Sequence, residues 1–352
     1  MDLSELINGV APPDEAARMA ARARWNQCAK PLGSLGLLET AIEDIAALTG
    51  RADVDLSEKA ALVLCSDNGV VRQGVTQTGS AVTAAVARQI ARGRSSVCRM
   101  AAVARCRVVP VDMGMLDFGG CDGVLDRRVG NGTADFTEGP AMTRAQAERA
   151  ILTGAALVRE EAARGAHLIA TGEMGIGNTT TASAVADVLL GRSAREVTGR
   201  GAGLSDAGLA RKVAVIERGV ARNRPEASDA LDVLAKLGGF DLAGLCGVYL
   251  GGARYRVPVL IDGFPSAVAA LCAIRFCPAA AGAMLASHVS AEPAGALVLD
   301  ALGKRALLTA EMRLGEGTGA VAAMPLLDMA LAVYRDACTF AEGGIAPYTP
   351  QC

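Results

Sequence analysis

Aromatic residues are scarce in this sequence. Phenylalanine, tyrosine and tryptophan together make up 3% of its 352 residues. Such a chain has few rings on which unpaired bases can stack, which argues against a protein that binds single-stranded nucleic acid. Neither sign of charge dominates, because the sequence has 35 basic and 37 acidic residues and a net charge of −2. The sequence therefore lacks the basic surface that binds duplex nucleic acid or an anionic membrane.

Metal-binding spacings are also missing. Histidine occurs only as His167 and His288, and none of the ten cysteines forms a Cys-x-x-Cys pair. Structural zinc sites usually combine closely spaced cysteines and histidines. We therefore expect no metal site, and we expect the cysteines to be small core residues rather than members of disulfides.

Long uninterrupted apolar runs are absent as well, although the mean hydropathy is +0.31. The two most apolar stretches, residues 267–286 and 320–333, each contain a proline and a charged residue. A membrane-spanning helix needs roughly 20 mostly apolar residues, so both stretches are predicted to be buried core. The first residues, MDLSE, show neither the basic nor the apolar part of a signal peptide. We expect a cytoplasmic protein without a membrane segment.

The sequence does contain an alternation of strand-like and helix-like segments. Short apolar, largely β-branched runs predict strands at residues 61–65, 107–112, 167–171 and 257–262. Alanine-rich segments predict helices at residues 81–91, 144–164, 180–190 and 205–221. This alternation is typical of a layered, Rossmann-like α/β fold with a mostly parallel sheet and flanking helices.

Further helices are predicted near both ends of the chain, within residues 14–50 and 319–340. We expect the terminal segments, residues 1–50 and about 320–352, to pack together as a small helical lobe. Residues 51–319 would then form a large α/β domain that carries the active site.

Polar or glycine-rich turns follow the four predicted strands, at residues 66–69, 112–114, 172–175 and 262–263. In open parallel sheets, ligands bind beyond the carboxyl ends of the strands. We therefore expect these turns to converge on one site.

The segment TGEMGIGNTTT, residues 171–181, joins a predicted strand to a predicted helix. Its glycines permit a tight turn, and Asn178 and Thr179 can cap the helix. Backbone amides at such a helix start attract phosphate. The segment is neither a Walker loop nor a G-x-G-x-x-G fingerprint, so an anion site and a purely structural turn are both open.

A second glycine-rich turn, GRGAGL, occupies residues 199–204 and precedes another predicted helix. Lys212 lies one to two turns inside that helix. Two glycine-rich helix starts and a lysine together make a phosphate cradle, although a solvated lysine beside Arg211 is the simpler reading of Lys212 alone.

Glu316 stands between glycines in the segment RLGEGTG, residues 313–319. A ligand can approach this carboxylate closely because its neighbours have no side chains, so Glu316 is a candidate general base. The alternative is a carboxylate that caps the helix that follows. His288 stands near Ser290 without a convincing triad, and a single histidine of this kind is more often a core residue.

Taken in order along the chain, these segments resemble the nicotinate-nucleotide–dimethylbenzimidazole phosphoribosyltransferase family, known as CobT. The matching words cover nearly the whole chain: KPLGSLG at 30–36, GTADF at 132–136, EGPAMT at 138–143, GEMGIGNTT at 172–180, GRG at 199–201, DGF at 262–264, SHVSAEP at 287–293 and RLGEG at 313–317. Each motif alone is weak evidence for the family, but the set of motifs in this order is specific.

The resemblance implies a homodimeric enzyme that needs no metal or other cofactor. It implies that the enzyme transfers phosphoribose from nicotinate mononucleotide to a benzimidazole-type base. Glu316 would be the catalytic base, and Glu173 would contact the ribose or the nicotinate. The remaining expected contacts are Gly175, Gly177, Gly201, Gly203 and Lys212 for the 5′-phosphate, with Asn178 and Thr179 at the same helix start; Asp262 and Ser290 for the nucleotide; and Ser80, Val82 and Leu314 for the acceptor base.

One position departs from the family pattern. Many members carry Asp-His-Gly after the first strand, whereas this chain has Asp67-Asn68-Gly69. We expect this region to border the acceptor pocket, so the acceptor stays open among dimethylbenzimidazole, another benzimidazole, adenine and a phenol. A kinase, an NAD-dependent oxidoreductase and a nucleotide-sensing subunit without turnover are the competing functions. The missing phosphate and dinucleotide fingerprints argue against the first two.

Overall fold

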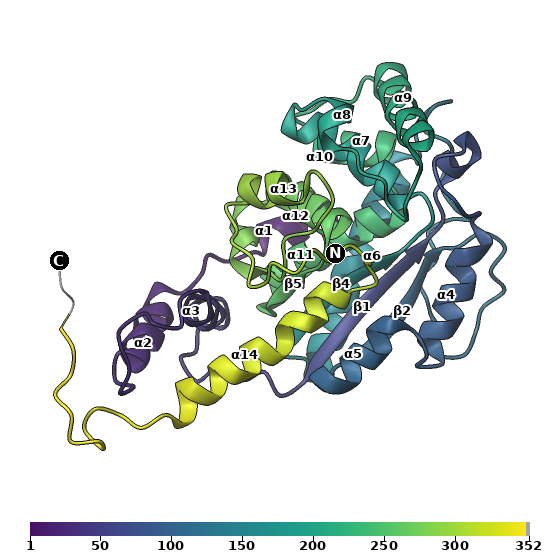
Figure 1. Cartoon of the computed structure of the whole chain (residues 1–352). Helices are drawn as coiled ribbons and strands as arrows, with labels where there is room; N and C mark the ends of the chain where they lie inside the picture. The colour runs from purple at the N-terminus through teal and green to yellow at the C-terminus, as the bar shows by residue number, and fades with distance from the viewer. Residues whose placement is uncertain (350–352) are drawn as a thin grey trace.

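A parallel six-stranded sheet forms the centre of the computed structural model, which describes residues 1–349 (Figure 1). The strands are β1 (Lys59–Ser66), β2 (Arg107–Gly114), β3 (Leu125–Asp126), β4 (Leu168–Met174), β5 (Val259–Ile261) and β6 (Met284–Ala286). Their order is β3-β2-β1-β4-β5-β6, and every neighbouring pair is parallel. The sequence order of the strands runs one way from β1 to β3 and the other way from β4 to β6, so the switch point lies between β1 and β4. Open parallel sheets bind ligands at the carboxyl ends of the strands at such a switch point. The predicted Rossmann-like α/β fold is confirmed.

Helices connect and cover the strands. They are α1 (Leu3–Asn8), α2 (Glu15–Trp25), α3 (Leu37–Thr49), η1 (Gly69–Gln73), α4 (Ala81–Ala91), α5 (Ser96–Ala104), α6 (Arg144–Ala163), α7 (Asn178–Leu190), α8 (Ala194–Val197), α9 (Asp206–Asn223), α10 (Ala230–Leu237), α11 (Phe240–Tyr255), α12 (Phe264–Phe276), η2 (Pro278–Ala283), α13 (Gly295–Ala301) and α14 (Thr318–Asp336). Both apolar stretches noted in the sequence are core, because they form α12, η2, β6 and most of α14, where buried residues prevail.

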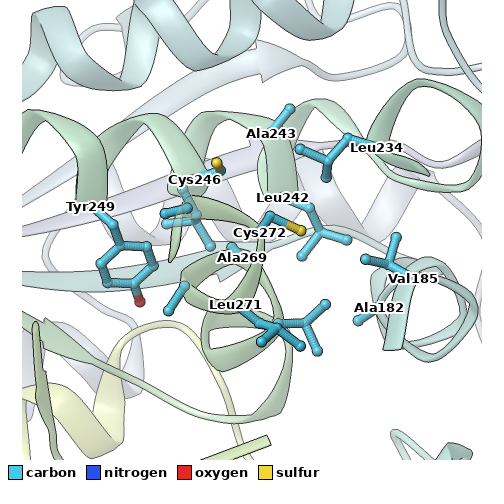
Figure 2. Packing of buried hydrophobic residues seen from close by; sticks show 14 of the residues in the cluster. Ala182, Val185, Leu234, Leu242, Ala243, Cys246, Tyr249, Ala269, Leu271 and Cys272 are labelled. Atoms are coloured by element: carbon cyan, nitrogen blue, oxygen red, sulfur yellow. The ribbon is translucent and has the colours of Figure 1, made fainter. Parts of the chain in front are cut away.

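The helix α11 is buried along its length against one face of the sheet. The close approach of α11 to α6 depends on glycine. A Cβ at Gly154 of α6 would lie 1.9 Å from the carbonyl oxygen of Gly244 of α11. Figure 2 shows Leu242, Cys246 and Tyr249 of this helix packed with side chains of α12, α7 and α10. Burial of these side chains is the main stabilisation of this half of the protein.

The other face of the sheet is covered by α4, α5 and α14. The helices α2 and α3, purple in Figure 1, lie beside the C-terminal part of α14, drawn in yellow. The rings of Trp25 and Tyr334 pack edge to face at 5.0 Å, and the backbone N–H of Ala29 donates to the carbonyl of Cys338 at 2.8 Å. One hydrophobic cluster runs from these helices to the sheet. The division into two lobes stays a prediction, and its last residues, 350–352, lie outside the described residues.

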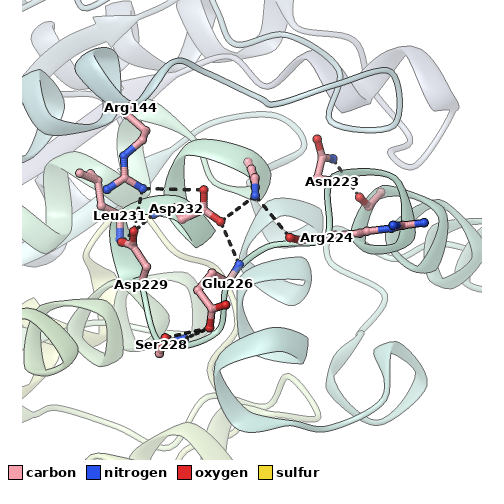
Figure 3. Close-up of polar contacts among 10 residues, drawn as sticks. Arg144, Asn223, Arg224, Glu226, Ser228, Asp229, Leu231 and Asp232 are labelled. Carbon is pink, nitrogen blue, oxygen red and sulfur yellow. Dashed lines mark hydrogen bonds and ion pairs between the residues drawn. The ribbon is translucent and has the colours of Figure 1, made fainter.

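A polar network fixes the connection between α9 and α10 (Figure 3). Arg144 pairs with Asp229 at 2.8 Å, and Asp232 accepts hydrogen bonds from the backbone of Glu226 and from Lys236, both at 2.8 Å. The connection therefore anchors the C-terminal end of α9, the helix that carries Lys212.

No helix within residues 1–349 is long and apolar enough to cross a membrane. The nine cysteines in this part of the chain are all free, and Cys352 lies outside it.

Candidate active site

A cavity of about 230 Å³ opens beyond the carboxyl ends of β4, β5 and β6. Its wall is formed by five segments from distant parts of the sequence and by four isolated residues. The segments are residues 75–78, 173–179, 200–204, 263–265 and 313–316, with Gly203 left out of the third, and the single positions are Lys212, His288, Ser290 and Glu292.

One part of the cavity wall has features that favour an anion. The loop after β4 turns at Gly177, where φ is +93°, and α7 then starts at Asn178, so that Asn178 and Thr179 at the helix start line the cavity. The N-terminal end of a helix favours an anion. Lys212 is 1% exposed, and its Nζ donates to Thr179 Oγ1 at 2.8 Å and to the Gly199 carbonyl at 3.1 Å. A Cβ at Gly201 would lie 2.9 Å from Thr179 Oγ1, so only glycine leaves room beside the ammonium.

Lys212 is therefore a buried cation and not a solvated surface lysine. Burial lowers the pKa of its ammonium to about 8, and the carboxylate of Glu292 opposes this shift. Glu292 lines the same end of the cavity, and its buried Oε2 has no hydrogen-bond partner within residues 1–349. A desolvated ammonium without a close counter-ion gains most from a bound anion such as a phosphate.

Glu316 lines the same cavity and stands on a strained turn. Its φ is +61°, between Gly315 at +84° and Gly317 at +87°. A side chain is held in this left-handed region only when surrounding contacts enforce it, as happens at functional sites. Its N–H donates to the carbonyl oxygen of Glu173 at 3.2 Å, which fixes the turn against the end of β4.

The carboxyl group of Glu316 is partly withdrawn from water. Burial raises its pKa above the usual value, the backbone amide of Val97 lowers it, and Asp262 raises it further. Its Oε2 is buried without a hydrogen-bond partner among the described residues. A raised pKa in a cavity is the property expected of a general base.

Asp262, not Glu316, caps the helix that follows. Its Oδ2 accepts from the N–H of Gly317 at 3.1 Å, and its Oδ1 accepts from the N–H groups of Gly319 at 2.8 Å and Ala320 at 3.0 Å. These are the free amides at the start of α14. The alternative interpretation, in which the Glu316 carboxylate caps α14, is therefore wrong. Asp262 itself lies behind the cavity wall and is not part of its lining.

Glu173, near the end of β4, also lines the cavity and is 7% exposed. The side-chain amide of Asn178 donates to its Oε2. Burial raises the pKa of Glu173 well above its usual value, and the nearby carboxyl groups of Asp241, Asp262 and Glu316 add to this rise. Burial and the neighbouring acids therefore favour the protonated form of Glu173, which can donate a hydrogen bond as well as accept one.

His288 and Ser290 line the wall beside Gly263. A Cβ at Gly263 would lie 3.8 Å from both His288 Nε2 and Ser290 Oγ, so the two polar groups face the same point. Burial lowers the pKa of His288, and Asp262 opposes this shift. The sequence analysis interpreted His288 as a core residue and did not predict that it lines the cavity. It also did not predict Glu292 and Arg313 as lining residues. The words SHVSAEP and RLGEG contain all three.

The structure brings most of the expected site residues together, including Glu173, Gly175, Gly177, Asn178, Thr179, Gly201, Lys212, Ser290, Leu314 and Glu316. Gly203, Ser80 and Val82 are not part of the lining. Ser80 immediately precedes α4, and the carbonyl of Gly203 accepts a hydrogen bond from the Gln77 amide at 2.5 Å.

Of the four polar turns that follow the predicted strands, only those at residues 172–175 and 262–263 line the cavity. The other two, at residues 66–69 and 112–114, do not. Asp67 accepts from Thr83 Oγ1 at 2.6 Å and from the N–H of Leu116 at 2.8 Å, and Asp112 pairs with Arg128 at 3.0 Å. The predicted convergence of all four turns is wrong, because these two aspartates stabilise loops. Asn68 is buried beneath the loop at Gly175 and does not line the cavity.

The match to a known family agrees with this geometry. A family model described as Phosphoribosyltransferase matches residues 10–345. The chain belongs to this phosphoribosyltransferase family. It is therefore an enzyme of the glycosyltransferase type, as predicted from the ordered sequence words.

Relatives in the family are similar over nearly their whole length. The nicotinate-nucleotide–dimethylbenzimidazole phosphoribosyltransferase of Acetivibrio thermocellus is 45% identical over 328 residues, 93% of each chain. The protein of the same name from Chloroflexus aggregans is 46% identical over 345 residues, 98% of each chain. The crystal structure of CobT from Thermus thermophilus is 40% identical, with a TM-score of 0.90 over 95% of this chain and all of that chain. The predicted resemblance to CobT is confirmed.

Proposed function

We propose that the protein transfers the 5-phosphoribosyl group of nicotinate mononucleotide to 5,6-dimethylbenzimidazole or a related base. The products are an α-ribazole 5′-phosphate and nicotinate, for assembly of the nucleotide loop of cobalamin. The observation that carries the proposal is the presence, in one cavity, of a buried ammonium at Lys212 and a carboxyl group with a raised pKa at Glu316. The names of the relatives supply the two substrates.

The reaction is a single displacement. A ring nitrogen of the acceptor base attacks C1′ from the face opposite nicotinate, and the C1′–N bond to nicotinate breaks. The bonding electron pair goes to the pyridinium nitrogen, so nicotinate leaves without protonation. Attack from the opposite face converts the β-nucleotide into an α-nucleotide.

Glu316 removes the proton that this reaction releases. As the new bond forms, the other imidazole nitrogen becomes acidic, and a carboxylate within hydrogen-bond reach accepts its proton. The negative carboxylate also favours the positive charge that develops on the ribose. General-base help of this kind is typically worth about 10²–10⁴-fold in rate.

The buried end of the cavity holds the phosphate in this proposal. Lys212, Thr179 and the positive N-terminal end of α7 would bind the 5′-phosphate. Glu173 would contact the ribose or the nicotinate, and Ser290 would contact the nucleotide. Leu314, at 59% exposure on the rim, is the candidate contact to the acceptor base.

The test is a direct assay. The protein is incubated with nicotinate mononucleotide and a panel of bases that includes dimethylbenzimidazole, benzimidazole, adenine and a phenol. Nicotinate release that depends on one of these bases supports the proposal and identifies the acceptor. Binding of the nucleotide without nicotinate release with any base would contradict it and would favour a nucleotide-sensing protein.

We further propose that the protein acts as a cytoplasmic homodimer. Light scattering on the purified chain checks the homodimer, and fractionation of cells that express the protein checks its location.

A further inference from the structure

The imidazole of His288 has a fixed place in the cavity wall, although the proposed reaction gives it no role. The residue is 3% exposed and lies just beyond the end of β6. A Cβ at Gly319 would lie 2.0 Å from His288 Nδ1 and 2.1 Å from its Cε1, so the ring packs against the backbone of the first turn of α14. Within residues 1–349 the ring makes one hydrogen bond, through Nδ1, and its Nε2 makes none.

Ser287 determines which ring nitrogen of His288 carries the hydrogen. Ser287 is 0% exposed, and its Oγ lies 2.5 Å from the carbonyl oxygen of Ile261 and 3.0 Å from His288 Nδ1. A carbonyl oxygen can only accept, so the hydroxyl donates its hydrogen to Ile261. The Ser287 oxygen then accepts from Nδ1, which carries a hydrogen. In the neutral ring Nε2 is therefore an acceptor.

The surroundings of His288 favour the neutral ring. In the described part of the chain, no carboxylate lies within ion-pair distance of either of its nitrogens, whereas His167 has such a partner in Asp55. The oxygens of Asp262 accept from three amides at the start of α14. Burial lowers the pKa of the imidazole, and Asp262 only opposes this shift. The ring is therefore neutral at neutral pH.

Ser290 supplies a donor beside this acceptor. It is 7% exposed, and its Oγ accepts from the N–H of Glu292 at 3.3 Å. Its hydroxyl hydrogen has no acceptor among the residues that the structure describes. A Cβ at Gly263 would lie 3.8 Å from both Ser290 Oγ and His288 Nε2, so the glycine leaves the space in front of the two groups open to the cavity.

An acceptor and a donor that face one point select a hydroxyl group. A hydroxyl can donate to His288 Nε2 and accept from Ser290 at the same time. A carboxylate or an ionised phosphate oxygen has no hydrogen for Nε2, and an ammonium has no lone pair for Ser290. The nucleotide of the proposed reaction has two suitable groups, the 2′- and 3′-hydroxyls of its ribose.

We propose that His288 and Ser290 bind one hydroxyl of the nucleotide ribose, with His288 Nε2 as the acceptor, and that Ser287 is the positioning residue that keeps the hydrogen on Nδ1. The assignment of the hydroxyl to a ribose rests on the proposed function. The state of the imidazole does not, because it follows from Ser287 and Ile261. The ring packs against α14 just after Glu316, so this contact would hold the ribose close to the proposed base.

The first test determines the tautomer and needs no turnover. The sequence has two histidines, His167 and His288. NMR of the chain labelled with ¹⁵N-histidine, prepared without a histidine tag, therefore gives two sets of ring signals, which His167→Gln assigns. We expect the hydrogen of His288 on Nδ1 in the parent, and we expect Ser287→Ala to lose this preference. A hydrogen on Nε2 in the parent would overturn the proposal, whatever the activity, and an unchanged tautomer in Ser287→Ala would overturn the role of Ser287.

The second test asks whether Nε2 meets a ribose hydroxyl. Nicotinate mononucleotide, its 2′-deoxy analogue and its 3′-deoxy analogue are added to the labelled parent without an acceptor base. We expect the nucleotide and one analogue to shift the Nε2 signal of His288, and we expect the analogue that lacks the bound hydroxyl to leave it in place. The signals of His167 should not move. A shift with all three ligands, or with none, would show that Nε2 does not bind a ribose hydroxyl.

Two variants of His288 separate its nitrogens. His288→Asn keeps a donor near the place of Nδ1, and His288→Gln can place an acceptor near that of Nε2. By calorimetry, we expect His288→Asn to weaken binding of nicotinate mononucleotide about fivefold or more, the size of one lost hydrogen bond. Its affinity for the analogue that lacks the bound hydroxyl should equal that of the parent. His288→Gln should recover part of the loss, and the control His167→Asn should bind all three ligands as the parent does.

Equal losses of His288→Asn for the nucleotide and both analogues would overturn the proposal. Binding that depends on the hydroxyl, without nicotinate release with any base, would support this inference and contradict the proposed function. The NMR comparison of the three ligands uses the parent protein, so it decides the matter where a variant does not fold.

Discussion

The backbone N–H of Glu316 donates a hydrogen bond to the carbonyl oxygen of Glu173 at 3.2 Å, so the two glutamates are held by a backbone contact and not by their side chains. Gly172 makes this contact possible, because a Cβ there would lie 2.7 Å from the carbonyl carbon of Glu316. The candidate base is thereby tied to the end of β4, although 143 residues separate the two in sequence, the difference between positions 316 and 173.

Replacement of Gly172 by alanine should therefore separate the two glutamates. The new methyl group meets backbone atoms, which cannot move aside as a flexible side chain would. We expect Gly172→Ala to lower kcat by about 10²-fold, since a displacement of about 1 Å at a reacting group has costs of that size. Steady-state kinetics measures the loss. Gly139→Ala is the control, because a Cβ at Gly139 meets nothing within 4 Å; an equal loss in both variants would contradict the prediction.

Loss of the carboxylate at Glu316 should affect chemistry and not binding. We expect Glu316→Gln to lower kcat about 10²-fold or more, while the Kd of nicotinate mononucleotide changes little, because the proton acceptor is gone and the shape is kept. Turnover and calorimetry give the two quantities. Glu311→Gln changes an exposed glutamate five positions earlier in the chain and serves as the control. Near-normal turnover of Glu316→Gln would show that Glu316 is not the base.

The sequence predicted the fold well where the pattern is local. Residues 81–91 were predicted as a helix and form α4, and the run 61–65 lies inside β1. The strand β6 was missed because it directly follows the apolar helices α12 and η2 without a charged or polar break. The helix α11 was missed because four glycines, which disfavour helix, occupy its interior for close packing against α6 and the sheet.

The candidate site was predictable where residues adjoin in sequence and not where they meet only in the fold. The loop from Gly175 to Thr179 contains its own signal, a glycine turn before a helix start. The choice between a base and a cap for Glu316 could not be made from its own segment, because the true cap, Asp262, comes from the end of β5. For the same reason the sequence did not distinguish Asp67 and Asp112, which stabilise loops, from acids that face the cavity.

Removal of the Lys212 ammonium should weaken phosphate recognition selectively. We expect Lys212→Ala to weaken binding of nicotinate mononucleotide by about 10-fold or more, since a charge-assisted hydrogen bond is worth about 1.5–3 kcal/mol. Binding of the phosphate-free nucleoside should change little. Calorimetry with both ligands makes the comparison, and Lys236→Ala, at a lysine paired with Asp232 away from the cavity, is the control. Equal losses for nucleotide and nucleoside would show that Lys212 does not bind the phosphate.

Affinity for the nucleotide should also fall at high pH. Burial lowers the pKa of Lys212 to about 8, so its ammonium is protonated below that pH and loses its charge above it. A neutral amine cannot pair with the phosphate, and we expect the Kd to rise about fivefold between pH 8 and pH 9. Binding measured across this range checks the prediction. The rise should be absent from Lys212→Ala, and a rise that persists there would have to come from another group.

Asp262 should hold Glu316 in place through α14. Its carboxylate accepts from three amides at the start of that helix, and these have no alternative acceptor if the side chain is removed. We expect Asp262→Ala to lower the free energy of unfolding by about 2 kcal/mol or more, since it removes a helix cap and leaves buried donors unpaired. Urea denaturation measures this loss. Asp262→Asn keeps one acceptor oxygen and should lose less. Because the start of α14 follows Glu316 directly, kcat should fall in the same order, and an Asp262→Ala variant with parental stability and turnover would show that the cap is dispensable.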